Sequence, residues 1–203
     1  GKSLNNSKKA PDYLSCEELT LFLNSIEEYP YTEPYSFRNR LMIKIAIYTG
    51  LRISEVLSLR VKDVTLEDEL YYFKTITKGN KERIVGVKYN KLAADYNVWI
   101  KVAKRKHKDL LFVSLKNTNN TTKLSQPYVH NLVSGLLRYC GLTKTKEGAH
   151  MLRHTFATLL YRKTKDIVLV QEALDHASLN TTKIYTHLDV DRIKKVSELF
   201  DDV

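Results

Sequence analysis

The chain has 203 residues, and 43% of them are hydrophobic, which is enough for one substantial domain with an apolar core and excludes a disordered polypeptide. Its formal net charge is +10, from 33 Lys and Arg against 23 Asp and Glu, which indicates either a polyanionic partner or a surface charged for solubility. The longest apolar run, 41–51, is interrupted by Lys44 and is too short to span a bilayer, so no membrane-spanning segment is expected.

The cysteines indicate the compartment of the protein, and the N-terminal segment indicates how the domain is connected. Cys16 and Cys140 are far apart and form no CxxC pair, so they predict neither a zinc site nor a disulfide framework. Such cysteine usage is typical of a reducing cytoplasm, where we expect the protein. No secretory signal peptide is recognisable. Residues 1–11 are polar and predict a linker, and because the chain opens on Gly1 we expect it to be part of a longer protein.

Apolar residues at helical spacing predict that most of the chain is α-helical. Ser15 and Glu18 form a capping box that opens the first helix, and Ser54 is expected to cap the third. Gly50 ends the second helix, and Asp166 is the expected N-cap of the seventh. The predicted helices span 15–26, 36–49, 54–59, 91–106, 125–140, 149–161, 166–174 and 189–200.

Between the third and fourth helices the pattern changes to that of β-strands. Residues 70–76 and 83–87 are rich in β-branched and aromatic side chains. They flank the turn sequence Lys-Gly-Asn-Lys at 78–81, which predicts an antiparallel hairpin. Residues 111–113 predict one more short strand. The expected fold is therefore mostly α with a small antiparallel β-sheet, an α+β domain.

One tyrosine stands among histidines and arginines near the end of the chain. The segment 174–187 holds His176 and Tyr185 and follows His150 and Arg153, which share a helix face at i, i+3 spacing. Attack on a phosphodiester without a metal ion requires such a set. The phenol is the nucleophile, and fixed cationic donors stabilise the charge of the transition state. The pattern therefore indicates strand exchange in DNA.

Several of these signals also have an ordinary structural interpretation. Glu55, one helical turn after Arg52, either orients that arginine for chemistry or forms a plain ion pair at a helix start. Lys78 at the hairpin tip is either a general acid for a leaving 5′ oxygen or a solvated turn residue. His154 completes a His-x-x-x-His spacing, but the zinc motif requires Glu where the chain has Met151, so no metal site is expected.

Taken together and in this order, four stretches resemble those of the tyrosine site-specific recombinases, the integrase family, and within it the Xer-type enzymes. They are TGLRISE at 49–55, KGNKER at 78–83, HMLRHTFAT at 150–158 and LDHASLNTTKIYTH at 174–187. The resemblance covers most of the chain. It implies that residues 12–203 are the catalytic domain, with the N-terminal core-binding domain of the family outside this chain.

The resemblance implies which residues hold the DNA phosphate. Arg52 and Arg153 would hold the nonbridging oxygens of the scissile phosphate, His176 would be the third donor, and Glu55 would be a supporting carboxylate. One departure from the family pattern is Asp175, where the family usually has Gly. This difference leaves open the backbone conformation and the charge beside His176.

The resemblance also implies which residues transfer protons and which one forms a covalent bond to DNA. Tyr185 would form the 3′-phosphotyrosyl bond, with His150 as general base, and Lys78 would protonate the departing 5′ oxygen. A 5′ hydroxyl of the partner strand then attacks the tyrosyl ester, so neither ATP nor a metal ion nor another cofactor is expected.

Further DNA and protein contacts are expected around this centre. Lys81 and Arg83 are expected to bind the DNA backbone, together with a basic helix over 101–108 whose charges equally fit a solvated face. The tail helix at about 189–200 is expected to dock either on a neighbouring protomer of a homotetramer or in cis on its own domain. Without the preceding domain, we expect this chain to recombine its site weakly or not at all.

The implied function is site-specific DNA recombination of the Xer type in the cytoplasm, which serves chromosome partition at cell division by resolving chromosome dimers. A septal DNA translocase would be a further partner. Within the family, the alternative is DNA integration by an integrase or transposase of a phage or mobile element. From other classes, the alternatives are a type IB topoisomerase-like enzyme and a catalytically silent DNA-binding module.

Overall fold

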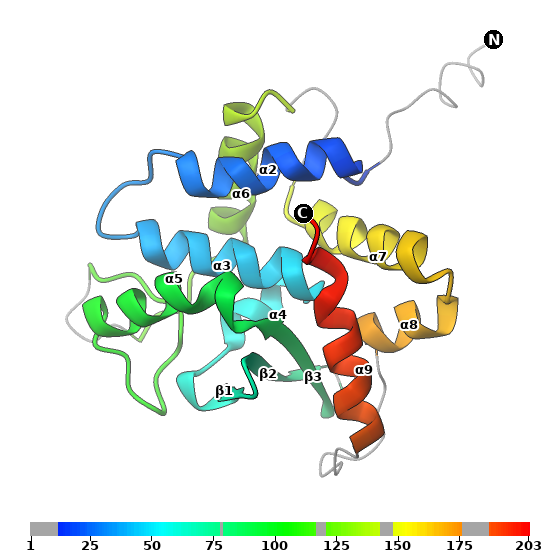
Figure 1. Ribbon diagram of the computed structural model, residues 1–203. Helices are drawn as coiled ribbons and strands as arrows, with labels where there is room; N and C mark the ends of the chain where they lie inside the picture. The colour runs from blue at the N-terminus through cyan, green and yellow to red at the C-terminus, as the bar shows by residue number, and fades with distance from the viewer. Residues whose placement is uncertain (1–11, 78, 117–120, 143–147, 176–186) are drawn as a thin grey trace.

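The structure is a computed structural model that describes residues 12–77, 79–116, 121–142, 148–175 and 187–203 (Figure 1). The predicted linker at 1–11 lies outside the described residues. In chain order the described elements are α2 (Cys16–Glu28), α3 (Ser36–Thr49), α4 (Ile53–Ser58), η1 (Val61–Asp63), β1 (Val64–Glu67), β2 (Leu70–Thr77), β3 (Lys81–Lys88), α5 (Tyr89–Val102), α6 (Gln126–Tyr139), α7 (His150–Thr164), α8 (Ile167–Asp175), α9 (His187–Ser197) and η2 (Glu198–Phe200).

Helix α3 is the centre of the core. Figure 1 shows it running between α2 on one side and α5 with the sheet on the other, while α7 and the C-terminal segment meet its end. Most of its residues are buried, because neighbours pack around nearly its whole circumference. Lys44 of α3 therefore needs a partner, and its Nζ lies 2.8 Å from Oδ2 of buried Asp95 on α5 and also contacts Glu27 of α2. This ion network ties the three helices together.

The sheet has the order β1-β2-β3 and is antiparallel throughout. Thr77 pairs with Lys81 at the end of the β2–β3 hairpin, which confirms the predicted hairpin. Strand β1 was not among the predicted strands. The short strand expected at 111–113 is absent: Val113 makes only an isolated bridge with Lys123, and Leu110, just before the segment, makes another with Arg60. No described segment lies alongside it for long enough to form a ladder.

Two predicted helix boundaries need correction. Helix α4 is capped by Arg52 and not by Ser54, because the side chain of Glu55 accepts the Arg52 N–H at 2.9 Å. Helix α5 ends at Val102, and Lys104 has a φ of 52°. The predicted basic helix over 101–108 is therefore wrong: most of this run is turn, because a residue with positive φ cannot continue an α-helix.

The C-terminal segment docks in cis. Phe200 is 2% exposed, and its ring centroid lies 4.9 Å from that of Tyr48 on α3 and 6.4 Å from that of Phe156 on α7. Lys163 of α7 donates a hydrogen bond of 2.7 Å to the carbonyl of Leu199. Of the two predicted modes of tail docking, this structure has the one in which the tail packs on its own domain.

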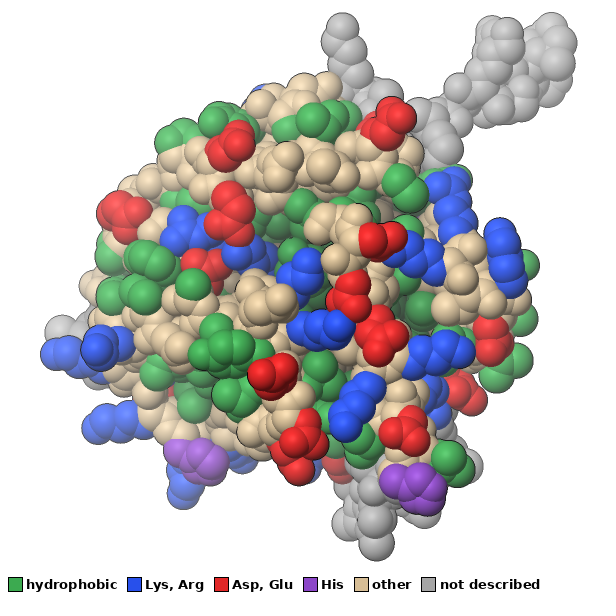
Figure 2. All heavy atoms as spheres, viewed as in Figure 1, with side chains coloured by type: hydrophobic (Ala, Val, Ile, Leu, Met, Phe, Trp, Pro, Cys, Tyr) green, Lys and Arg blue, Asp and Glu red, His purple; other side chains and the backbone are tan. Residues whose placement is uncertain are grey.

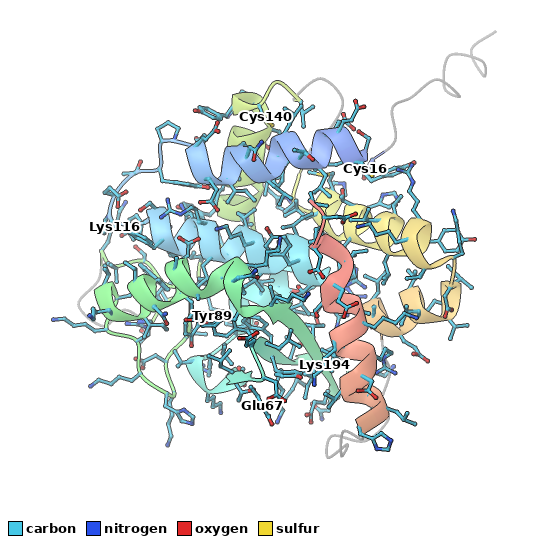
Figure 3. All side chains as sticks on the ribbon, in the orientation of Figure 1. Cys16, Glu67, Tyr89, Lys116, Cys140 and Lys194 are labelled. Carbon is cyan, nitrogen blue, oxygen red and sulfur yellow. The ribbon has the colours of Figure 1, made fainter. Side chains whose placement is uncertain are left out.

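The structure also describes the two cysteines and the lengths of the helices. Cys16, at the start of α2, and Cys140, after α6, are free thiols well apart from each other (Figure 3). Burial raises the pKa of the Cys140 thiol, so this side chain is less readily ionised than an exposed cysteine. Within the described ranges, no helix has the length and apolarity needed to cross a membrane.

Candidate active site

The turn between α3 and α4 brings the two predicted phosphate-binding arginines together. Gly50 ends α3 with a φ of 71°, and Arg52 opens α4 two residues later. Arg153 of α7 donates one hydrogen bond of 2.7 Å to the carbonyl of Gly50 and another of 3.2 Å to the carbonyl of Leu174. The guanidinium of Arg153 is thus fixed between the turn that carries Arg52 and the end of α8, two residues before His176.

Glu55 connects this turn to the sheet. Its carboxylate is buried, with a side chain that is 6% exposed. One oxygen accepts the Arg52 N–H at 2.9 Å and lies 3.8 Å from Nη1 of Arg52, and the other accepts the Thr75 hydroxyl at 3.3 Å. Thr75 belongs to β2, the strand that leads to residue 78. The Arg52 side chain is 44% exposed, so its backbone is fixed while its guanidinium faces solvent.

His150 is the first residue of α7, one helical turn before Arg153. Its imidazole is 64% exposed, and its Nε2 lies 2.8 Å from Oδ2 of Asp12. His150 is therefore accessible to a substrate, and Arg153 on the same helix is anchored to the Gly50 turn. Across the described residues, no group of three or more His, Cys, Asp or Glu side chains is arranged to hold a metal ion.

Three of the predicted catalytic residues, Lys78, His176 and Tyr185, lie outside the described residues, and so does the side chain of Asp175. The structure describes their neighbours in the chain: β2 and β3 flank position 78, and α8 ends just before His176. Their roles stay predictions.

The two predicted DNA-contact residues differ in exposure. Lys81 is partly exposed at the start of β3, but Arg83 is only 2% exposed. Alternate residues of a strand share a face, so Arg83 lies on the same side of β3 as Val85 and Val87, which are buried. It lines a pocket with Phe156. The Arg83 guanidinium is therefore in the interior of this structure and not on the surface, where contact with a DNA phosphate was expected.

A basic groove that Glu55 helps to line was not predicted from the sequence. Four of its lining side chains carry or can carry positive charge: Arg60 after α4, Lys62 of η1, Lys74 of β2 and His107 after α5. Two carboxylates, Glu55 and Asp63, also line it. Lys123 lies next to it, since its Nζ donates a hydrogen bond of 3.1 Å to Ser58 Oγ. No sequence motif links these positions. On the face shown in Figure 2, by contrast, Lys and Arg are interspersed with Asp and Glu over α5 and α9.

This site combines two arginines, an exposed histidine and a buried carboxylate beside a basic groove. Such an arrangement suits phosphodiester chemistry on a nucleic acid. The particular family follows from comparison: the chain belongs to the Phage integrase family, whose sequence model matches residues 13–192.

Two curated relatives are tyrosine recombinases named XerH. The one from Campylobacter jejuni is 46% identical over 191 residues, which are 94% of this chain and 52% of the relative. The one from Helicobacter pylori is 40% identical over 205 residues, which are 100% of this chain and 55% of the relative. This chain therefore spans about half the length of these relatives.

A solved structure is similar over most of the chain. It is XerH site-specific recombinase bound to difH substrate in a pre-cleavage complex, with a TM-score of 0.76 and 41% identity over 90% of this chain and 53% of that one. The predicted fold class and the resemblance to Xer-type tyrosine recombinases are both confirmed.

Proposed function

We propose that residues 12–203 are the catalytic domain of a Xer-type tyrosine recombinase, which cleaves and rejoins DNA strands at a specific site. The observation that carries this proposal is the double anchoring of Arg153 on the carbonyls of Gly50 and Leu174. This contact draws together the turn of Arg52, the helix of His150 and the end of α8, and these are three of the segments that the family's chemistry requires. The similarity to the XerH enzymes supports the same assignment.

In the proposed reaction, the two arginines hold the scissile phosphate and the tyrosine attacks it. Guanidinium groups are always charged and offer paired N–H donors, so Arg52 and Arg153 suit the nonbridging oxygens of a phosphodiester. His176 adds a third donor. The Tyr185 phenol loses its proton to His150 and forms a 3′-phosphotyrosyl bond, while the bond from phosphorus to the 5′ oxygen breaks.

In the same cleavage step, Lys78 gives a proton to the departing 5′ oxygen, which leaves as a hydroxyl. Rejoining reverses these roles. A 5′ hydroxyl of the partner strand attacks the phosphotyrosyl bond and gives its proton to the neutral Lys78 amine, while the bond from phosphorus to Tyr185 breaks and the phenol recovers its proton from His150. Each phosphoester bond broken is replaced by one formed, so the strand is rejoined without a nucleoside triphosphate as an energy source. Glu55 supports this cycle by fixing the backbone of Arg52.

We assign the DNA-backbone contacts beside the scissile phosphate to the basic groove and to Lys81 at the hairpin. The groove adjoins Glu55, so a duplex that places a phosphate at Arg52 would pass Arg60, Lys62 and Lys74. Binding through such contacts weakens steeply as salt concentration rises, because each phosphate neutralised releases counterions.

In the cell, the proposed role is resolution of chromosome dimers in the cytoplasm by a homotetramer on its recombination site, with a septal DNA translocase as a further partner. The named relatives support the Xer-type role. Exchange of the tail between protomers would need release of Phe200, which is buried in cis here.

The test is incubation with a nicked duplex that carries a difH site, so that the cleaved strand cannot be rejoined. The wild-type chain should give a covalent protein–DNA band on a denaturing gel. Tyr185→Phe should abolish the band, while Tyr161→Phe, at an exposed tyrosine of α7, should leave it unchanged. A band of equal intensity from Tyr185→Phe would refute the proposal.

A further inference from the structure

The start of α7 is held by a histidine from another helix. The N-cap residue of α7 is Ala149, which has no side chain able to cap the helix, and it is 1% exposed. A buried backbone N–H at a helix start needs an acceptor from elsewhere. That acceptor is Nδ1 of His130 on α6, at 2.8 Å from the Ala149 nitrogen.

The supporting histidine also lies close to His150. A Cβ built at Gly148 would lie 3.0 Å from Nδ1 of His150 and 3.3 Å from Nδ1 of His130, so both imidazoles border the Gly148 backbone. The peptide held by His130 is Gly148–Ala149, one peptide before the one that joins Ala149 to His150. A shift of this peptide would move the imidazole of His150 and the start of the helix that carries Arg153.

We propose that His130 is a positioning residue for His150 in DNA cleavage. The Nδ1 lone pair of His130 fixes the Ala149 N–H, and through it the place where α7 begins. The bond requires an unprotonated Nδ1, because an N–H there would face another donor. This proposal rests on the proposed function, since it takes His150 to be the general base for the attacking phenol.

Two variants of His130 distinguish the loss of the hydrogen-bond acceptor from the loss of the imidazole ring. His130→Ala removes the acceptor. His130→Asn keeps one, because the Asn Oδ1 stands about where Nδ1 stands in histidine. The neighbouring Asn131 is exposed on the same helix, and Asn131→Ala is the matched control.

The experiment measures single-turnover cleavage of the nicked difH duplex by the full chain, alongside DNA affinity and the thermal midpoint of each variant. We expect His130→Ala to cleave about 10–100-fold more slowly, since small misplacements of catalytic groups have effects of this size. DNA affinity should stay unchanged. His130→Asn and Asn131→Ala should cleave at close to the wild-type rate. A wild-type rate for His130→Ala, or equal slowing in the Ala and Asn variants at wild-type stability, would overturn the proposal.

A second measurement does not depend on activity. Amide hydrogen exchange at Ala149, followed by NMR, should be at least about tenfold faster in His130→Ala than in the wild type and slow again in His130→Asn. Unchanged exchange in His130→Ala would refute the support by His130. Failure of the wild type to form any covalent adduct would instead count against the proposed function.

Discussion

Replacement of Gly50 by alanine tests how tightly the catalytic turn is packed. Gly50 has a φ of 71°, a left-handed conformation that costs a residue with a Cβ about 1–2 kcal/mol. The new Cβ would also lie 2.4 Å from Cδ1 of Phe156, whose ring is buried and stacks near that of Phe200. Overpacking of this kind costs about 1–3 kcal/mol. Together these effects predict that Gly50→Ala lowers the free energy of unfolding by about 2–5 kcal/mol.

Gly141→Ala separates the two contributions. Gly141 has a φ of 79°, but among the described residues beyond its chain neighbours no atom lies within 4 Å of a Cβ at this position. It should therefore lose only the conformational part, about 1–2 kcal/mol. Urea denaturation of both variants measures the difference. Gly50→Ala should also slow cleavage, because the Gly50 carbonyl anchors Arg153. Equal losses of stability in the two variants would refute the packing argument.

Three further predictions concern the tail, the buried carboxylate and pH. Phe200→Ala should cost about 3–5 kcal/mol by thermal unfolding, whereas Leu188→Ala, at a side chain 69% exposed, should cost under about 0.5 kcal/mol; equal midpoints would contradict cis docking. Glu55→Ala should cost about 1–3 kcal/mol in urea denaturation, because it removes the carboxylate that accepts from the Arg52 N–H and the buried Thr75 hydroxyl, and Glu55→Gln less; equal costs would contradict this. A hydrogen bond from Lys163 lowers the pKa of the Asp202 carboxyl from its ordinary value of 3.8, so this contact stabilises the tail above that pH and is lost as pH falls through the folded-state pKa. Tail amide exchange should accelerate in acid more in the wild type than in Asp202→Asn, and identical profiles would contradict the assignment.

The elements that sequence predicts well are those set by local signals. The capping box of Ser15 and Glu18 does open α2, and the helix over 36–49 ends at Gly50 as expected. The end of α5 and the interior position of Arg83 were not predicted. Both depend on what the rest of the chain packs against them, and neither a run of lysines nor a single arginine in a strand carries that information.

For the site, the residues could be predicted but their contacts could not. Motifs in a fixed order identify Arg52 and Arg153 as candidates, whereas the hydrogen bonds of Arg153 to two backbone carbonyls require the folded chain. The same holds for His130, which stood alone in the sequence with no chemical pattern around it. Its contact with Ala149 joins segments 19 residues apart. The basic groove likewise assembles charges from separate elements.

The central claim is that Tyr185 is the group that becomes joined to DNA at the phosphate held by Arg52 and Arg153. The most direct measurement is mass spectrometry of a protease digest of the trapped protein–DNA adduct, after nuclease treatment. The account predicts a nucleotide mass on the peptide that contains Tyr185, linked through its phenolic oxygen to a 3′ phosphate. An adduct on any other residue, or a link to a 5′ phosphate, would contradict it.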